Sequence, residues 1–218
     1  MINFKMILEK LPLLLPFGLI TLKIALIAML IGLLLGLVTA LFRLYKLAVL
    51  DKVSELYVFV IRGTPLLVQI YIVYFGLPRI GIEFSAYNSA YLALGVNVGA
   101  YLSEVFRGAI KSIDKGQLEA ALSVGMTYWQ AMYRIILPQA ALVALPATGN
   151  TFINLIKNTS LVFVISIEEI MAKTKKLAAL HGSYLEMYIT AAIVYLILFL
   201  LIYKLQAFLE RNLEKAYQ

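Results

Sequence analysis

Residues 24–41 read IALIAMLIGLLLGLVTAL, a run of eighteen residues without a single charge. Because a helix needs about 20 mostly apolar residues to cross a bilayer, this run predicts a membrane-spanning helix, which we extend to residues 13–42. The apolar region of a secretory signal peptide is only about 7 to 15 residues long, so this segment is expected to stay in the mature protein. Gly32 and Gly36 form a small-residue pair that allows a second helix to approach closely.

The composition of the whole chain also indicates a membrane protein. Of its 218 residues, 62% are apolar and 14% are charged, whereas soluble domains carry about 25% charged residues. These values exclude an ordinary water-soluble fold, and the high apolar content excludes a disordered chain. The absence of cysteine excludes disulfides, cysteine-ligated zinc and thiol catalysis. The net charge of +7 comes from basic residues scattered between apolar runs, which is typical of membrane proteins with basic cytoplasmic loops.

Four further apolar runs follow the first, so the sequence predicts an all-α integral membrane protein with five transmembrane helices in one domain. The predicted spans cover residues of about 13–42, 52–77, 86–110, 135–156 and 185–208. Arg62, Gly63, Thr64 and Pro65 interrupt the second span, where a kink is expected because proline lacks an amide donor and disfavours helix just before it. The first and fifth spans have long charge-free cores and are expected to face lipid. The middle three carry polar residues and are expected to lie inside the bundle.

Two connections are long enough to hold structure of their own. The loop 111–134 is polar, yet residues 117–133 have apolar positions at helical spacing, so one or two short helices are expected there. Between residues 157 and 184, Ser166 and Glu169 match a capping box at the start of another short helix. Lysine and arginine are more frequent on the side of the 111–134 loop. This bias predicts that the loop and the carboxyl terminus are cytoplasmic and that the amino terminus is outside.

The sequence contains no nucleotide-binding, hydrolase, zinc-protease or dinucleotide motif, so no catalytic role and no metal site are predicted. The informative residues are polar side chains at membrane depth, which are costly there and usually face a cavity or a partner. Asn97, Tyr101 and Glu104 share one face of the third span, and the fourth span repeats this spacing. Together these faces predict a polar substrate pocket formed by Gln69, Asn97, Tyr101, Ser103, Glu104, Asn150, Asn154 and Lys157.

Each of these candidates also has a structural interpretation. The amides can instead form hydrogen bonds between helices, which contribute about 0.6 kcal/mol each. Glu104 can instead pair with Arg107, one helical turn away. If Glu104 faces the pocket, its carboxylate suits the ammonium group of a free amino acid, because charge pairing offsets the cost of desolvation. Ser103, Asn154 or Lys157 would then supply hydrogen-bond donors for the carboxylate of the ligand.

The loop between the third and fourth predicted spans carries a specific motif. It reads Glu119, Ala120, Ala121, three residues, Gly125, nine residues, Ile135, one residue, Leu137 and Pro138. This pattern resembles, at every signature position, the EAA motif of permease subunits in binding-protein-dependent ABC importers. Three other stretches resemble the polar amino-acid permeases of that group, namely RGTPLLVQ at 62–69, AYLSEVFRGAI at 100–110 and KNTSL at 157–161.

The resemblance implies a type I ABC importer fold in a bacterial cell (inner) membrane, and it implies partners. These are cytoplasmic ABC ATPase subunits, a second permease subunit that is identical or related, and an extracytoplasmic amino-acid-binding protein, with membrane lipid around them and no nucleic acid. The chain itself would hold no cofactor, because the partner ATPase would bind ATP and Mg. The coupling helix that docks on the ATPase would include Glu119, Ala120, Ala121, Ser123, Gly125 and Met126. An exposed helical knob of this kind can seat in a groove on another protein.

The expected function is therefore ATP-driven import of polar amino acids by alternating access. Basic amino acids or glutamine are favoured because the proposed lining is rich in amides. An ion-gradient-driven secondary amino-acid transporter would instead use Glu104 as its ion site, although an odd number of spans without inverted repeats speaks against it. A non-transporting assembly or receptor protein would use the buried amides for packing only.

Overall fold

The first predicted span lies within a single helix of 41 residues, α1 (Phe4–Leu44), which continues through Pro12 and Pro16. The structure is a computed structural model that describes the backbone of residues 2–217 and the side chains of residues 2–212, and this part of the chain contains helices and no strands. The other α-helices are α2 (Ala48–Gly63), α3 (Leu66–Tyr71), α4 (Ala86–Ser112), α5 (Lys115–Ser123), α6 (Tyr128–Ala131), α7 (Leu137–Asn158), α8 (Ile170–His181) and α9 (Tyr184–Tyr217). Between them lie π-helical turns at Ile72–Gly76 and Met132–Ile136 and 3₁₀ turns at Leu77–Ile80 and Thr159–Ile165.

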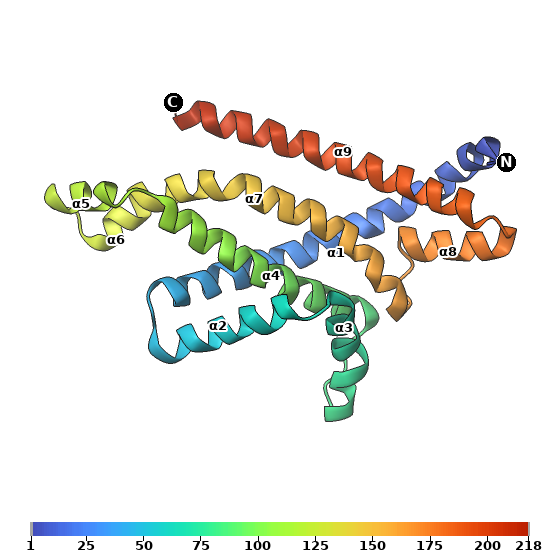
Figure 1. The fold of residues 1–218 in the computed structure, drawn as a ribbon, viewed down its shortest axis with the longest axis horizontal. Helices are drawn as coiled ribbons and strands as arrows, with labels where there is room; N and C mark the ends of the chain where they lie inside the picture. The colour runs from blue at the N-terminus through green and yellow to red at the C-terminus, as the bar shows by residue number, and fades with distance from the viewer. Residues whose placement is uncertain (1, 218) are drawn as a thin grey trace.

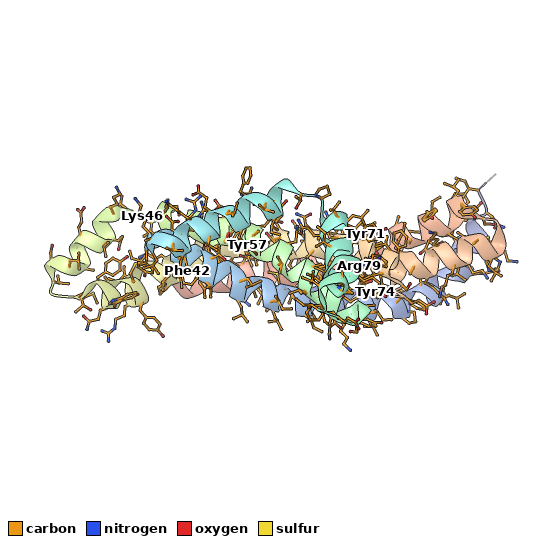
Figure 2. All side chains as sticks on the ribbon, turned by 90° about the horizontal axis from the view of Figure 1, so that it is seen from below. Phe42, Lys46, Tyr57, Tyr71, Tyr74 and Arg79 are labelled. Carbon is orange, nitrogen blue, oxygen red and sulfur yellow. The ribbon has the colours of Figure 1, made fainter. Side chains whose placement is uncertain are left out.

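The long helices extend along the long axis of the molecule (Figure 1). α5 and α6 lie at one end, together with the connection between α1 and α2, whereas the amino terminus and α8 lie at the other end. α3 and the turns after it stand across this axis, and the turned view shows this segment, marked by Tyr71, Tyr74 and Arg79, close to end-on (Figure 2). The 111–134 loop and the α1–α2 connection therefore share one end of the molecule.

α1 and α4 pack closely because glycines line both sides of their contact. A Cβ atom added to Gly36 would lie 2.8 Å from Leu102 Cβ, which is closer than packed side chains tolerate. Cβ atoms added to Gly32, Gly95 and Gly99 would also lie less than 3.0 Å from atoms of the facing helix. The small-residue pair on α1 thus meets a second pair on α4, and together they allow the two backbones to approach.

The second predicted span is broken rather than only kinked. The axis of α2 and that of the helical segment after the break differ by 108°. The break falls at Gly63, Thr64 and Pro65, where Thr64 and Pro65 take extended backbone conformations. Gln69 bridges the break, since its Nε2 donates hydrogen bonds to the carbonyl oxygens of Ile61 at 2.7 Å and Thr64 at 3.1 Å. The predicted kink is confirmed, and it is large enough to turn the chain across the bundle.

Within the described residues, three helical stretches are long and apolar enough to cross a membrane, and a fourth qualifies if the bent pair is one span. The three are Phe4–Leu44, Tyr128–Ile165 and Tyr184–Asn212. α4 does not qualify, and its contacts with α1 and α7 explain why, because side chains that face other helices need not be lipid-like. Its 27 residues nevertheless extend about 40 Å, which is sufficient to cross a bilayer. The count of five spans stays a prediction.

The prediction that α1 faces lipid is wrong for one side of the helix, whereas Leu19, Leu26, Leu30 and Leu34 on the other side are 54% to 71% exposed. α1 contacts α2, α4, α7, α8 and α9, and 44% of its most apolar window is buried. The window that includes α7 is only 17% buried, so the prediction that the fourth span lies inside the bundle is wrong for this chain alone. The apolar content of a helix does not distinguish contact with lipid from contact with other apolar helices. The small residues Ala25, Ala28, Gly32 and Gly36, all buried on α1, were the better signal of helix packing.

α8 forms where a short helix was expected, but its amino-terminal cap differs from the prediction. The cap is Glu169, whose carboxylate accepts hydrogen bonds from the backbone N–H groups of Met171 and Ala172, both at 2.9 Å. Ser166 instead takes a left-handed conformation with φ of 65°, so the predicted capping box is wrong. The Tyr195 hydroxyl donates to the same carboxylate at 2.8 Å. Burial raises the pKa of the Glu169 carboxyl, and the three hydrogen bonds oppose this shift.

Candidate functional site

A polar cavity lies where the break between α2 and α3 meets α4 and α7. Its volume is about 610 Å³, which falls within the range of roughly 300–1,000 Å³ for small-molecule sites. The residues that line this polar cavity are Thr64, Pro65, Leu66, Asn97, Val98, Tyr101, Thr151, Asn154, Leu155, Lys157 and Asn158. Four of the eight predicted pocket residues, Asn97, Tyr101, Asn154 and Lys157, are therefore brought together.

The lining of the polar cavity offers hydroxyl and amide groups, one ammonium group and no carboxylate. Lys157 is exposed, and no ion pair found in the described part of the chain involves it. An ammonium group without a protein carboxylate beside it suits the carboxylate of a ligand, because the ligand then supplies the missing opposite charge. Asn154 lies one turn before Lys157 on the same helix, so its amide can share that ligand.

Gln69 lies beside the polar cavity rather than in its lining. Its Oε1 accepts a hydrogen bond of 3.0 Å from Asn97 Nδ2, which joins α3 to α4. The interpretation of these two amides as an interhelical hydrogen bond is confirmed. Since Asn97 also lines the cavity, Gln69 holds both the shape of the helix break and the orientation of the Asn97 side chain.

The prediction that all eight residues line one pocket is wrong for three others as well. The Ser103 side chain is buried, and its hydroxyl donates to the carbonyl oxygen of Ala100 at 2.8 Å. Asn150 is exposed and lies outside the lining, as does Glu104. Helical spacing identifies the face on which a residue lies, but it does not identify which neighbour that face meets.

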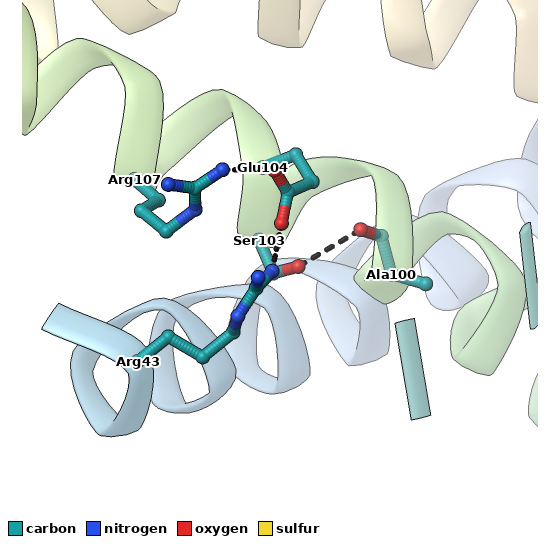
Figure 3. A network of polar contacts seen from close by, with 5 residues as sticks. All are labelled: Arg43, Ala100, Ser103, Glu104 and Arg107. Carbon is teal, nitrogen blue, oxygen red and sulfur yellow. Dashed lines mark hydrogen bonds and ion pairs between the residues drawn. The ribbon is translucent and has the colours of Figure 1, made fainter. Parts of the chain in front are cut away.

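Glu104 pairs with two arginines (Figure 3). Its Oε1 accepts a hydrogen bond from Nη1 of Arg43 near the end of α1, and its Oε2 accepts one of 2.5 Å from Nη2 of Arg107. The three side chains are only 17% to 26% exposed. The ion pair with Arg107 considered from the sequence is confirmed, whereas Arg43, 61 positions away, was not foreseen. The trio carries a net charge of +1.

A second cavity, of about 470 Å³, lies beside this trio. Its lining consists of Arg43, Glu55, Val58, Phe59, Arg62, Gly63, Tyr101 and Glu104, and we call it the charged cavity. Tyr101 lines both cavities. The guanidinium carbon of Arg62 lies 5.2 Å from the centre of the Tyr101 ring, which is within the range of a cation–π interaction.

Sequence reasoning missed three polar residues of the polar cavity, namely Thr64, Thr151 and Asn158. Thr64 and Asn158 lie in the stretches RGTPLLVQ and KNTSL, but they were treated only as part of a pattern. Thr151 lies three residues before Asn154, so helical spacing placed it on the same face. A short hydroxyl side chain costs little free energy at membrane depth, so its presence in the sequence does not by itself indicate a functional site.

The predicted coupling loop forms a hairpin of two helices, α5 and α6. After α5 the chain turns at Gly125, whose φ of 87° is a left-handed conformation that suits glycine. The N–H of Met126 donates back to the carbonyl oxygen of Ala121 at 3.1 Å, which closes the end of α5. Thr127 and Gln130 then form a capping box that starts α6. Gly125 therefore allows a tight turn between the two helices.

This hairpin presents apolar side chains to its surroundings. Leu122, Val124 and Trp129 are 45%, 79% and 66% exposed. Apolar side chains gathered on one protruding element are typical of a surface that binds another protein. Of the predicted coupling residues, Ala121 is buried and Met126 is partly buried, whereas the exposed ones are Glu119, Ala120, Ser123 and Gly125.

An aromatic cluster connects the hairpin to α1. The ring of Tyr45, directly after α1, lies 6.4 Å from that of Tyr128 and 5.3 Å from that of Trp129. These centroid distances fall in the range of favourable aromatic pairs. The contact was not predicted, and through it the hairpin directly contacts the residue that follows the longest helix of the bundle.

The described part of the chain contains no group of three histidine, cysteine or acidic side chains placed to hold a metal ion.

Residues 32–215 match the family model described as the binding-protein-dependent transport system inner membrane component. The chain belongs to this family. It is 44% identical to the probable amino-acid permease protein YxeN of Bacillus subtilis (strain 168), with 100% of this chain and 98% of YxeN covered. It is 42% identical to the probable amino-acid ABC transporter permease protein PatM of Vibrio harveyi, with 99% and 98% covered.

The fold is also similar to that of a solved transporter. The crystal structure of an amino acid ABC transporter with histidines matches with a TM-score of 0.89 and 36% identity, over 97% of this chain and 99% of that one. Family, relatives and fold agree, and the chain is a permease subunit of an ABC importer for amino acids. It is a multi-pass membrane protein and not a catalytic subunit, which agrees with the resemblance seen in the EAA motif.

Proposed function

We propose that this permease subunit carries glutamine or basic amino acids, and that the polar cavity is their site in the membrane. The observation that carries the proposal is the position of Lys157 and three asparagine side chains around one cavity at a helix break. The similarity to a transporter crystallised with histidines supports a polar, nitrogen-containing substrate.

In this proposal, Lys157 binds the carboxylate of the amino acid. Hydroxyl and amide oxygens of Thr64, Asn97 and Asn154 accept hydrogen bonds from its ammonium group and from the nitrogen of its side chain. This arrangement replaces the role predicted for Glu104, whose two carboxylate oxygens are already held by Arg43 and Arg107. The same pairing removes the free carboxylate that an ion-gradient-driven transporter would need at this position.

The proposed topology has five spans, with α4 and the bent α2–α3 segment counted in addition to the three most apolar stretches. In this topology the hairpin α5–α6 would be cytoplasmic and α8 would lie on the outer side, and their positions at opposite ends of the molecule support this (Figure 1). The amino terminus is then outside and the carboxyl terminus cytoplasmic. The excess of lysine and arginine on the hairpin side supports this orientation.

The proposed mechanism transmits force from the hairpin to the cavity. Two cytoplasmic ABC ATPases would bind ATP and Mg, and they would also bind the hairpins of two permease subunits, which are identical or related. A binding protein would deliver the amino acid on the outer side. Movement of the hairpin would reach α1 through Tyr45, Tyr128 and Trp129, and the close contact of α1 with α4 would carry it to the polar cavity. Shifting the two access states from 1:99 to 99:1 requires about 5.5 kcal/mol, which nucleotide binding can supply.

Uptake by membrane vesicles with and without ATP tests the proposal. Vesicles that contain the complete transporter are expected to take up L-glutamine or L-arginine only with ATP, and an uncoupler should have no effect. Lys157→Gln is expected to raise KM strongly because the carboxylate loses its partner, and Lys157→Arg should restore much of the uptake. Lys5→Gln, which removes the same charge from a highly exposed position, is the matched control. Unchanged uptake in Lys157→Gln, or uptake that follows the ion gradient, would contradict the proposal.

A further inference from the structure

The charged cavity holds ionisable groups that the proposed transport site does not use. Its lining includes two guanidinium groups, from Arg43 and Arg62, and two carboxylates, from Glu55 and Glu104. Only one pair among these four is engaged, because Arg43 and Glu104 bind each other. The described part of the chain contains no ion pair that involves Arg62 or Glu55.

The arrangement favours an anionic group from outside the chain. Glu104 also serves Arg107, so its carboxylate has no capacity left to neutralise a further cation. The Arg62 guanidinium rests on the Tyr101 ring, a contact that leaves the N–H donors at its edge available. A guanidinium presents these donors in a planar fork that matches a carboxylate, and such bidentate pairs are among the strongest hydrogen-bonded contacts in proteins.

Glu55 also lines the charged cavity, on the same helix as Arg62. Glu55 and Arg62 are separated by seven positions on α2, so they share a helix face and their backbones lie about 10 Å apart. The ammonium and carboxylate groups on the α-carbon of an amino acid are too close together to contact both Arg62 and Glu55. An amino acid with a nitrogen at the end of its side chain extends much further. Glutamine and the basic amino acids have this property.

The charged cavity lies between the polar cavity and the coupling end of the molecule. Arg43 is next to the α1–α2 connection, which lies at the same end as the hairpin α5–α6 (Figure 1). Tyr101 also lines the polar cavity, and the Arg62 guanidinium lies over its ring. A solute that leaves the polar cavity toward the hairpin end meets the charged cavity next.

We propose that the charged cavity is a second amino-acid site, in which Arg62 binds the carboxylate of the solute and Glu55 accepts a hydrogen bond from the nitrogen at the end of its side chain. This inference rests on the proposed function, since it gives the same solutes a second position on their way to the cytoplasm. Tyr101 lines both sites, and displacement of the Arg62–Tyr101 pair connects them.

The test measures how many solute molecules bind to each permease chain in the complete complex. The transporter with its co-purifying ATPase is placed in lipid nanodiscs without nucleotide, and binding of radiolabelled L-arginine and L-glutamine is measured by equilibrium dialysis. Wild type is expected to bind two solutes per permease chain, and Arg62→Gln and Lys157→Gln are each expected to bind one. Arg79→Gln removes the same charge from a residue that lines neither cavity and is expected to keep both sites.

The results distinguish failure of this site from failure of the proposed function. One bound solute that disappears in Lys157→Gln and is unaffected by Arg62→Gln overturns the second site and leaves the first intact. No bound solute in wild type overturns both. Arg62→Lys keeps the positive charge and removes the planar guanidinium donors. This variant keeps the site testable if Arg62→Gln does not assemble. It is expected to weaken one of the two sites several-fold, and two unaltered sites in this variant overturn the inference.

Discussion

The sharpest prediction concerns Glu104, for which sequence and structure assign different roles. As a substrate ligand, Glu104 would affect the response to solute when replaced by glutamine. As the centre of a trio with Arg43 and Arg107, it instead stabilises the contact between α1 and α4. In Glu104→Gln the two guanidinium groups keep their charges and lose the carboxylate that separates them. We therefore expect a loss of stability with little change in solute affinity at the polar cavity.

The magnitude follows from the exposure of the three side chains. Removal of one partner from a fully buried ion pair costs about 3–5 kcal/mol, and each hydrogen bond to a charged group contributes about 1.5–3 kcal/mol. Here the side chains are 17% to 26% exposed, so water replaces part of the lost interaction, and the glutamine oxygen still accepts one bond. A loss of about 2 kcal/mol results, which corresponds to a decrease in Tm of roughly 4–8 °C for a chain of this size.

Thermal unfolding in detergent, followed by circular dichroism, measures this change. Glu9→Gln is the matched control, because Glu9 is 59% exposed and its distance to Lys5 is 3.9 Å, an exposed pair that contributes at most about 0.5 kcal/mol. Adding Arg43→Gln to Glu104→Gln removes one of the two repelling charges and should recover part of the stability. The reasoning is refuted if Glu104→Gln keeps the wild-type Tm and instead abolishes solute-stimulated ATPase activity.

Three further substitutions test other parts of the structure. Gly125→Asp is expected to reduce solute-stimulated ATPase activity without loss of the assembled complex. The reason is that a side chain at φ of 87° strains the hairpin turn by about 1–2 kcal/mol. An ATPase assay on the purified complex measures the activity. Gly36→Ala should lower the stability by about 1–3 kcal/mol, since its Cβ would lie 2.8 Å from a facing side chain, whereas Gly108→Ala, with open space around it, should not lower the Tm. Burial raises the pKa of Glu169, so folding favours its protonated form and the stability of wild type should fall as the pH rises through that pKa. Glu169→Gln should lack this slope in Tm against pH, and an identical slope would contradict the interpretation.

Local features of the fold were predictable because each depends on a few neighbouring residues. Pro65 and the residues before it indicated an interruption of the second span, and the structure shows the chain turning there by 108°. The small residues of the EAA stretch indicated a tight turn between two short helices, which is the observed hairpin. The cap of α8 was the exception, since both Ser166 and Glu169 are capable of capping and only the buried position of Glu169 decides between them.

Features that depend on contacts between distant segments were not predictable in the same way. Helical spacing placed Asn97, Asn154 and Lys157 on faces that meet at one cavity, because each face had several polar residues to mark it. It gave no sign that Arg43, at the end of an apolar helix, reaches Glu104 on another helix. For the same reason the central position of α1 was missed, since apolar side chains suit lipid and protein neighbours equally.

The glycine contact between α1 and α4 limits which distances in this protein are able to change. Gly32, Gly36, Gly95 and Gly99 leave no space for one helix to slide past the other, so spectroscopic labels on α1 and α4 should keep one separation throughout the ATP cycle. α2 and the segment after Pro65 are joined instead by an extended stretch of chain and by the hydrogen bonds of one side chain, Gln69, so labels on these two segments should report two separations.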